Sequence, residues 1–371
     1  MPAARGAAWA LLAALLFGIS TPLLQSHGAG VGAFATAALL YAGAALVGAL
    51  SWRPIGREAR MRRADAPRLV AMAACGAVIG PVALAWGLQH TSGTSASLML
   101  TLEAVFTAFF AWALYRESID GRIGAAMALL LAGGALLVID QGRSGTAQVQ
   151  GLLAVLVATA AWGIDNSLSR ALADRDPGQV VLAKAALGAV TTALLAAAFG
   201  EAMPAWGTAA ALVAVGAIGY GLSLRFYLLA QRAFGAARTG SVFAFAPFIG
   251  AVAAALLGER AASAMLVGGG VLMLVGVALH LAERHGHAHV HDPLEHEHAH
   301  RHDDGHHEHG HHEHGHDHDQ DCDQGHAGPH PHDPSGAPGL PPGTTHSHPH
   351  RHAPQEHAHP HVPDAHHAHR H

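Results

Sequence analysis

Ten apolar runs, each about 20 residues long, fill the first 284 residues and are separated by short polar segments. An α-helix needs about 20 mainly apolar residues to cross the roughly 30 Å hydrocarbon core of a membrane. Because lipid offers no partners for backbone polar groups, runs of this length form helices there. We therefore expect an all-α membrane protein. The predicted spans are 7–27, 30–51, 69–88, 94–115, 122–140, 151–172, 178–199, 208–230, 238–257 and 264–282.

The last 87 residues, 285–371, have a very different composition. They hold 30 of the 33 histidines and 14 acidic residues against three arginines, with glycine and proline between them. A segment with so few large apolar side chains cannot bury a core, so we expect the tail to be disordered without a ligand. The chain thus divides into a membrane domain and a histidine-rich tail, which does not fit a soluble globular enzyme.

Positive charge gathers on one side of the predicted spans. If the N-terminus is cytoplasmic, the cytoplasmic segments hold 15 Lys and Arg residues and the opposite loops hold two, Arg143 and Arg260. Cytoplasmic loops of membrane proteins are enriched in Lys and Arg. We expect a cell (inner) membrane protein with both termini, and so the tail, in the cytosol. Arginine outnumbers lysine 20 to 1, as in GC-rich coding, which favours a bacterial source.

The two halves of the membrane domain resemble each other at an offset of 142 to 145 residues. Phe17-Gly18-Ile19-Ser20 aligns with Trp162-Gly163-Ile164-Asp165, and the block 102–117 aligns loosely with 245–259. Five spans per half is an odd number, so the second half must be inverted. The repeats are expected at 1–140 and 151–282. Inverted repeats recur in secondary transporters, whose substrate site lies near the midplane where the halves meet.

These blocks resemble the EamA type of the drug/metabolite transporter superfamily over about residues 5–282. The resemblance is carried by the fourth-span block that ends at Glu117, by the ninth-span block with Pro247 and Leu257-Gly258-Glu259, and by Trp162-Gly163. It implies ten spans in two five-helix repeats and a secondary transporter, often an exporter of metabolites or amino acids. Many relatives have proline after the fourth-span glutamate, where this chain has Ala104.

Glu103 is the first candidate for a substrate-binding or coupling residue, because it lies near the middle of the fourth span. A charged group at the centre of a span costs at least about 2.5 kcal/mol on insertion scales, so it is usually functional. Thr107 lies four residues later, on the same helix face. Glu103 could contact a cationic substrate group or carry a proton; the alternative is a structural carboxylate paired with an arginine.

Arg225, Asp165, Asn166 and Trp162 are the further candidates for substrate binding or coupling, and Lys184 is another ionisable residue within a span. Arg225 in the eighth span is the expected partner of Glu103, although it could also extend towards the cytoplasmic surface. Asp165 and Lys184 lie on adjacent helices and are expected to form a structural ion pair, with Asn166 beside them. Trp162 could line the cavity, but packing is the favoured interpretation.

The tail is the candidate metal site, since imidazole and carboxylate groups together suit Zn, Ni, Co and Cu ions. The tail histidines could instead sense pH, because histidine changes charge near neutrality. Repeat expansion with little function is the third interpretation. The candidate ligands are His296, His298, His300, His302, His306, His307, His309, His311, His312, His314, His316 and His318.

The leading hypothesis is an exporter of a small metabolite or amino acid, with the tail as metal buffer or regulator. A divalent transition-metal exporter whose tail collects the ion is the nearest rival, and a membrane metal sensor without transport is the third. We find no catalytic constellation or nucleotide-binding loop, so no enzyme is expected and no cofactor is required. The expected partners are lipid, a small-molecule substrate, metal ions at the tail and, as one option, a second copy in a homodimer, but no nucleic acid.

Overall fold

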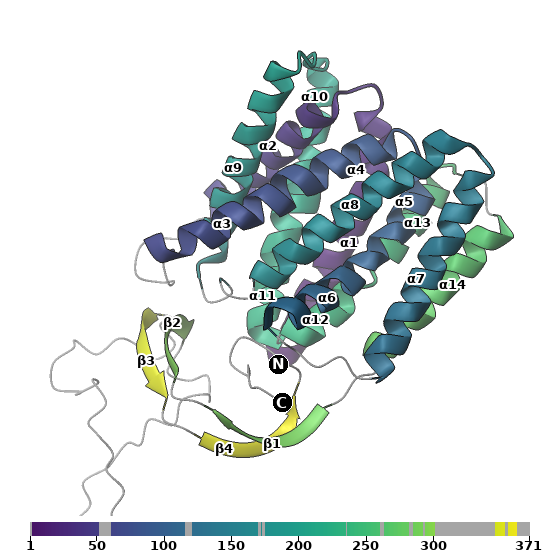
Figure 1. Ribbon diagram of the computed structural model, residues 1–371. Coiled ribbons are helices and arrows are strands. Elements are labelled where there is room, and N and C mark those ends of the chain that lie inside the picture. The colour runs from purple at the N-terminus through teal and green to yellow at the C-terminus, as the bar shows by residue number, and fades with distance from the viewer. Residues whose placement is uncertain are drawn as a thin grey trace, which may run out of the picture.

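The computed structural model describes residues 2–51, 61–115, 121–169, 172, 175–234, 236–259 and 263–281 of the membrane domain and four segments of the tail. The described part of the membrane domain is a bundle of helices (Figure 1). The first half contains α1 (Pro2–Gly28), α2 (Ala33–Ser51), η1 (Arg63–Asp65), α3 (Ala66–Met72), η2 (Ala73–Ile79), α4 (Gly80–Leu88), α5 (Gly93–Met99), η3 (Leu100–Leu102), α6 (Glu103–Tyr115) and α7 (Gly121–Gly142). The second half contains α8 (Thr146–Ser169), α9 (Pro177–Ala198), α10 (Trp206–Val215), η5 (Gly216–Leu222), α11 (Ser223–Phe234), α12 (Ala236–Phe243), α13 (Ala246–Leu256) and α14 (Ala264–Leu281).

Ten helical segments of the described membrane domain correspond to the ten predicted spans. Nine of them are long and apolar enough to cross a membrane, and the apolar helix α14 is slightly shorter. The third, fourth, eighth and ninth spans are assembled from consecutive shorter elements, such as α3, η2 and α4. The prediction of an all-α membrane protein is confirmed.

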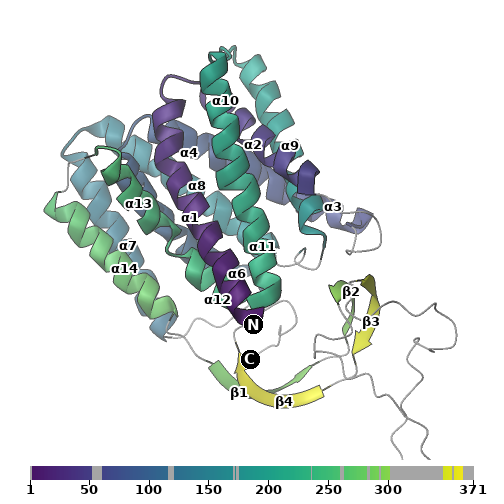
Figure 2. The ribbon, with the colours of Figure 1, turned by 180° about the vertical axis from the view of Figure 1, so that it is seen from behind.

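The helices of the two halves pack in pairs that follow a twofold pattern. The second and seventh spans, α2 and α9, lie against each other, as do the fifth and tenth, α7 and α14. Helix α1 packs against α11 and α13 of the second half, and α8 packs correspondingly against α4 and α6 of the first. Figures 1 and 2 show α7 and α14 side by side at one edge of the bundle. Such pairing is what two inverted five-helix repeats produce.

The third and eighth spans share an irregularity that the sequence did not predict. Each contains a seven-residue π-helical turn, η2 and η5, and these begin at Ala73 and Gly216, 143 positions apart. The separation agrees with the offset of the sequence repeat. The repeat therefore extends to the hydrogen-bonding pattern of the backbone.

Glycines let the backbones of α2 and the eighth span touch. An added Cβ at Gly43 would collide with the backbone of Val213 and Ala217, and one at Gly216 would collide with the backbone of Leu40. Small residues allow such close approach between helices in lipid, where the hydrophobic drive for association is weak. Glycine residues thus permit tight helix packing at this interface.

The fourth span changes its hydrogen-bonding pattern next to Glu103. Helix α5 ends at Met99, the 3₁₀ turn η3 covers Leu100–Leu102, and α6 begins at Glu103. Ala104 therefore follows an interruption that forms without the proline many relatives carry. The interruption sets Glu103 at the start of a new helical segment.

The described part of the tail consists of four strands. These are β1 (His285–His291), β2 (Leu294–His300), β3 (His346–His352) and β4 (Gln355–His361). Strand β1 pairs with β4 and β2 with β3, both antiparallel. Disorder is expected for the whole tail, 285–371, and these four segments differ from that expectation, because antiparallel pairing satisfies their backbone groups. The other residues of the tail lie outside the described part of the chain.

We expect Gly43→Ala to lower the stability of the membrane domain, because the methyl group meets backbone atoms that have no rotamer to change. Overpacking of this kind costs about 1–3 kcal/mol. The matched control is Gly124→Ala, whose added Cβ meets nothing within 4 Å. Thermal unfolding in detergent, followed by size-exclusion chromatography, should show a lower transition temperature for Gly43→Ala only. Equal transitions for the two variants would contradict the close contact.

Candidate functional site

A cavity of about 110 Å³ lies between the two repeats. Both halves line it: Phe17, Tyr41 and Glu103 come from the first, and residues of α8, α9, η5, α11 and α12 come from the second. For comparison, an apolar cavity of about 150 Å³ holds a benzene molecule. The lining continues along α8 from Trp162 to beyond Ser169, towards the end of the bundle where α8 connects to α9.

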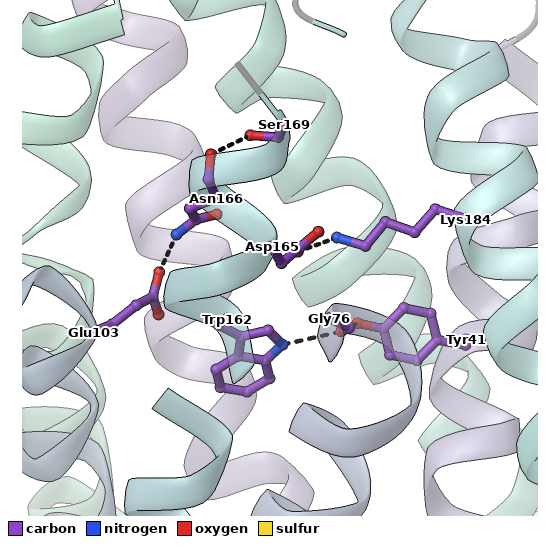
Figure 3. Close-up of polar contacts among 8 residues, drawn as sticks. All are labelled: Tyr41, Gly76, Glu103, Trp162, Asp165, Asn166, Ser169 and Lys184. Carbon is purple, nitrogen blue, oxygen red and sulfur yellow. Dashed lines mark hydrogen bonds and ion pairs between the residues drawn. The ribbon is translucent and has the colours of Figure 1, made fainter. Parts of the chain in front are cut away.

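Glu103 faces this cavity and is held by the second repeat. Its Oε1 accepts a hydrogen bond from Nδ2 of Asn166 (Figure 3). The Glu103 side chain is partly exposed, and the Ser169 hydroxyl donates to the backbone carbonyl of Asn166 at 2.8 Å. The first-repeat carboxylate therefore meets a neutral amide, which orients it without cancelling its charge.

Asp165 and Lys184 form a buried ion pair beside the cavity, as the sequence predicted. Asp165 on α8 is 5% exposed and Lys184 on α9 is 7% exposed, and Nζ of Lys184 contacts Oδ2 of Asp165. Gly76 in η2 lies so close to the Asp165 carboxylate that an added Cβ would collide with it. The ion pair thus connects two helices of the second repeat and packs against Gly76 of the first repeat.

The backbone carbonyl of Gly76 is the acceptor for two further polar side chains. It accepts hydrogen bonds from the Tyr41 hydroxyl and, at 3.0 Å, from Nε1 of Trp162 (Figure 3). Trp162 is 6% exposed and packs against Gly80, which lies about one turn after Gly76 in the third span. Trp162 also lines the cavity. Its favoured role in packing and its alternative role as a cavity wall are therefore compatible.

Aromatic rings form much of the remaining wall. The Phe17 ring contacts the rings of Trp162, Tyr220 and Phe243, with centroids 5.9, 5.8 and 5.4 Å away. Tyr227 continues the cluster, since its ring lies 5.0 Å from that of Phe243. Such rings offer apolar surface and negatively polarised faces in the same place.

The polar groups of the site break the symmetry of the repeat. Ser20 packs against Gly219 as Asp165 packs against Gly76, so the two motifs that align in the sequence occupy equivalent places. Tyr41 in α2 and Lys184 in α9 are 143 positions apart. The second repeat therefore carries the ion pair where the first carries neutral hydroxyl groups.

Two carboxylates of the second repeat cap helix starts of the first repeat at one end of the bundle. Glu201 accepts hydrogen bonds from the backbone of Phe34 and Ala35 at the start of α2, at 3.3 and 2.7 Å. Glu259 accepts from Gly93 N at 2.7 Å and from Thr94 N and Oγ1, both at 2.8 Å, at the start of α5. Unpaired amides at a helix start favour such anionic caps.

At the opposite end of the bundle, Nε of Arg175 donates to Asp65 at 2.9 Å. Arg175 follows the end of α8, and Asp65 precedes α3, so this ion pair also connects the second repeat to the first. Contacts between the repeats are therefore present at both ends of the bundle.

Two predicted residues lie away from the centre of the site. Arg225 is on α11 and is not among the described residues that line the cavity, and the hydrogen bond to Glu103 comes from Asn166 instead. Thr107 lies where α6 packs against Gly163, and its carbonyl accepts a long bond of 3.5 Å from Ser167. It contributes to helix packing more directly than to the cavity.

The predicted metal-ligating histidines fall in the tail. His296, His298 and His300 lie in β2. The remaining ones lie outside the described residues: His302, His306, His307, His309, His311, His312, His314, His316 and His318.

Sequence reasoning missed Tyr41, Tyr220 and Phe17 as lining residues, because an aromatic residue within an apolar run usually packs. The offset between the repeats could have identified one of these residues, Tyr41. Tyr41 precedes Lys184 by 143 positions, so an ionisable residue of the second repeat points to its counterpart in the first.

Two inverted five-helix repeats around a central cavity that contains ionisable side chains are the architecture of a multi-pass membrane transporter. Comparison with family models identifies it further: residues 4–139 and 149–282 each match the EamA-like transporter family. The matches cover more than half of the chain, one on each repeat, and the chain belongs to this family.

Individual relatives agree with this assignment. An uncharacterized transporter of Methanothermobacter thermautotrophicus is 27% identical over an alignment of 232 residues, and the match covers 59% of this chain and 66% of that protein. The chain thus spans just under two thirds of the length of that relative. A solved crystal structure is similar with a TM-score of 0.56 and 22% identity, over 74% of this chain and 95% of the other, and supports the fold.

Removing Lys184 should destabilise the protein more than removing the whole ion pair. Lys184→Met leaves the Asp165 carboxylate buried without its cation, which typically costs about 3–5 kcal/mol. Asp165→Asn combined with Lys184→Met should recover most of this loss, because no charge remains unpaired. Thermal unfolding of purified protein measures both. A double variant as unstable as Lys184→Met would show that the pair does not act as described.

Proposed function

We propose that the protein is a secondary transporter that exports a small metabolite or amino acid, with Glu103 as its coupling residue. The observation that carries the proposal is the position of the Glu103 carboxylate, which faces a cavity between the repeats and is bonded to neutral Asn166. A carboxylate in this setting can exchange a proton for a substrate group. Substrate sites of inverted-repeat transporters lie at the same place.

The proposal places the protein in the inner membrane of a bacterium, with both termini in the cytosol. The distribution of Arg residues among the loops supports this orientation. The lining of the cavity reaches towards the end where α8 connects to α9, which is cytoplasmic in this arrangement. Substrate would therefore enter from the cytosol, in keeping with export.

The described membrane domain favours an organic substrate over a divalent metal ion. Within the described residues, no group of three or more His, Cys, Asp and Glu side chains is arranged to hold a metal ion. Glu103 and Asp165 supply two carboxylates, and Lys184 already pairs with one of them. Metal export remains the second candidate function, because of the tail.

For the tail we propose metal binding that buffers or senses cytosolic Zn, Ni, Co or Cu. Its strands set histidine opposite histidine at three positions of each ladder. The pairs are His285 and His361, His287 and His359, His289 and His357, His296 and His350, His298 and His348, and His300 and His346. Residues at alternate positions of a strand share one face, and histidine is a common ligand of these ions.

Glu103→Gln should abolish the dependence of transport on the proton gradient, because the amide cannot exchange a proton. The assay is uptake of a transported substrate into proteoliposomes, with and without an imposed pH difference. Asp140→Asn is the matched control, since Asp140 bonds Ser263 near the far end of α7. Unchanged rate and unchanged pH dependence in Glu103→Gln would refute its role in coupling.

A growth experiment separates the two candidate substrates. A deletion strain and a strain that produces residues 1–284 only are challenged with Ni²⁺, Co²⁺, Zn²⁺ and Cu²⁺ and with amino acids. We expect the deletion strain to be sensitive to the amino acids. The strain that produces residues 1–284 should differ only in its response to the metal ions. Metal sensitivity of the deletion that residues 1–284 reverse would instead support metal export.

A further inference from the structure

Among the described residues that line the cavity, the charged groups include one carboxylate that no lining cation contacts. The charged residues among the described lining are Glu103, Asp165 and Lys184. Lys184 contacts Asp165, while Glu103 receives a hydrogen bond from the neutral amide of Asn166. With all three groups ionised, the site carries one net negative charge. A bound monocation would neutralise it.

Two buried polar atoms of the same cavity have no hydrogen-bond partner among the described residues. They are Oδ1 of Asp165 and the hydroxyl of Tyr220. Asp165 is 5% exposed and Tyr220 is 7% exposed, and both line the cavity. Buried polar groups are almost always hydrogen-bonded, so a ligand that donates to them would complete the site. An ammonium group supplies three donors.

The aromatic wall suits the rest of such a ligand. Phe17 stands at the centre of a cluster whose neighbouring rings, Trp162 and Tyr220, also line the cavity. The faces of aromatic rings attract cations, and their area packs well against an apolar body. Trp162 is three residues from Asp165 on α8, so the aromatic and acidic surfaces adjoin.

We propose that the cavity binds a monocationic organic amine, with its ammonium group between Glu103 and Asp165 and its apolar body against the rings around Phe17. Asn166, adjacent to Asp165 in α8, ties Glu103 to the same side of the cavity. A carboxylate on the ligand would meet two carboxylates, and Lys184 is already paired. The inference rests on the proposed transport function and narrows its substrate to an amine.

The test compares four ligands of similar shape on the purified full chain in lipid nanodiscs, by calorimetry. They are 2-phenylethylamine, neutral 2-phenylethanol, zwitterionic phenylalanine and anionic 3-phenylpropionate. We expect the amine to bind at least about tenfold more tightly than each of the others, a difference of about 1.4 kcal/mol. Equal or tighter binding of the alcohol or the anion would overturn the proposal. This comparison needs no variant.

Variants then place the binding in the cavity rather than on the acidic tail. Glu103→Gln should weaken amine binding about tenfold and leave binding of the alcohol unchanged, because it removes one charge and keeps the shape. Asp140→Asn, away from the cavity, should leave both unchanged. Full amine affinity in Glu103→Gln would overturn the assignment.

Failure of the amine-binding proposal can be distinguished from failure of the proposed transport function. If the amine binds as expected but is not carried across proteoliposomes, the site stands and the transport proposal fails. If another class of compound is transported in a Glu103-dependent way and amines do not bind, the transport proposal stands and the amine is excluded.

Discussion

Charged groups inside a membrane domain must find their partners within the protein, and the Asp165–Lys184 ion pair meets this requirement at the centre of the bundle. The pair joins α8 to α9, and Gly76 of the third span lies directly against its carboxylate. The carbonyl of the same glycine accepts from Tyr41 and Trp162, which come from opposite repeats. One charged contact thereby fixes four spans around the cavity.

The twofold pattern determines how the helices are arranged, and the departures from it determine which ionisable groups line the cavity. Equivalent π-helical turns and equivalent glycine contacts recur in both repeats. Asp165 and Lys184 have neutral counterparts in Ser20 and Tyr41, so the ionisable groups gather on one side of the pseudo-symmetric cavity. A symmetric site would bind ligands in two opposed orientations. The observed site has an acidic side and an aromatic side, and so orients an amphipathic ligand.

The sequence was sufficient for the spans, the repeats and the Asp165–Lys184 pair, because apolar run length and the cost of isolated charges depend on local sequence. It did not identify Asn166 as the partner of Glu103, since that contact depends on how α6 crosses α8. The caps formed by Glu201 and Glu259 join residues more than 160 positions apart, which no local pattern reports. The π-helical turns leave no trace in hydropathy, and they set Gly76 against the ion pair.

Access to the cavity during binding tests the account most directly. Ser169 lines the cavity near the end of α8, so a cysteine there, in a chain with Cys75 and Cys322 replaced by alanine, reports on this space. We predict that a membrane-impermeant thiol reagent labels Ser169→Cys from the side of the membrane that holds the N-terminus, and that 2-phenylethylamine slows the labelling. Labelling from the opposite side alone, or at a rate that the amine does not change, would contradict a substrate site between the repeats.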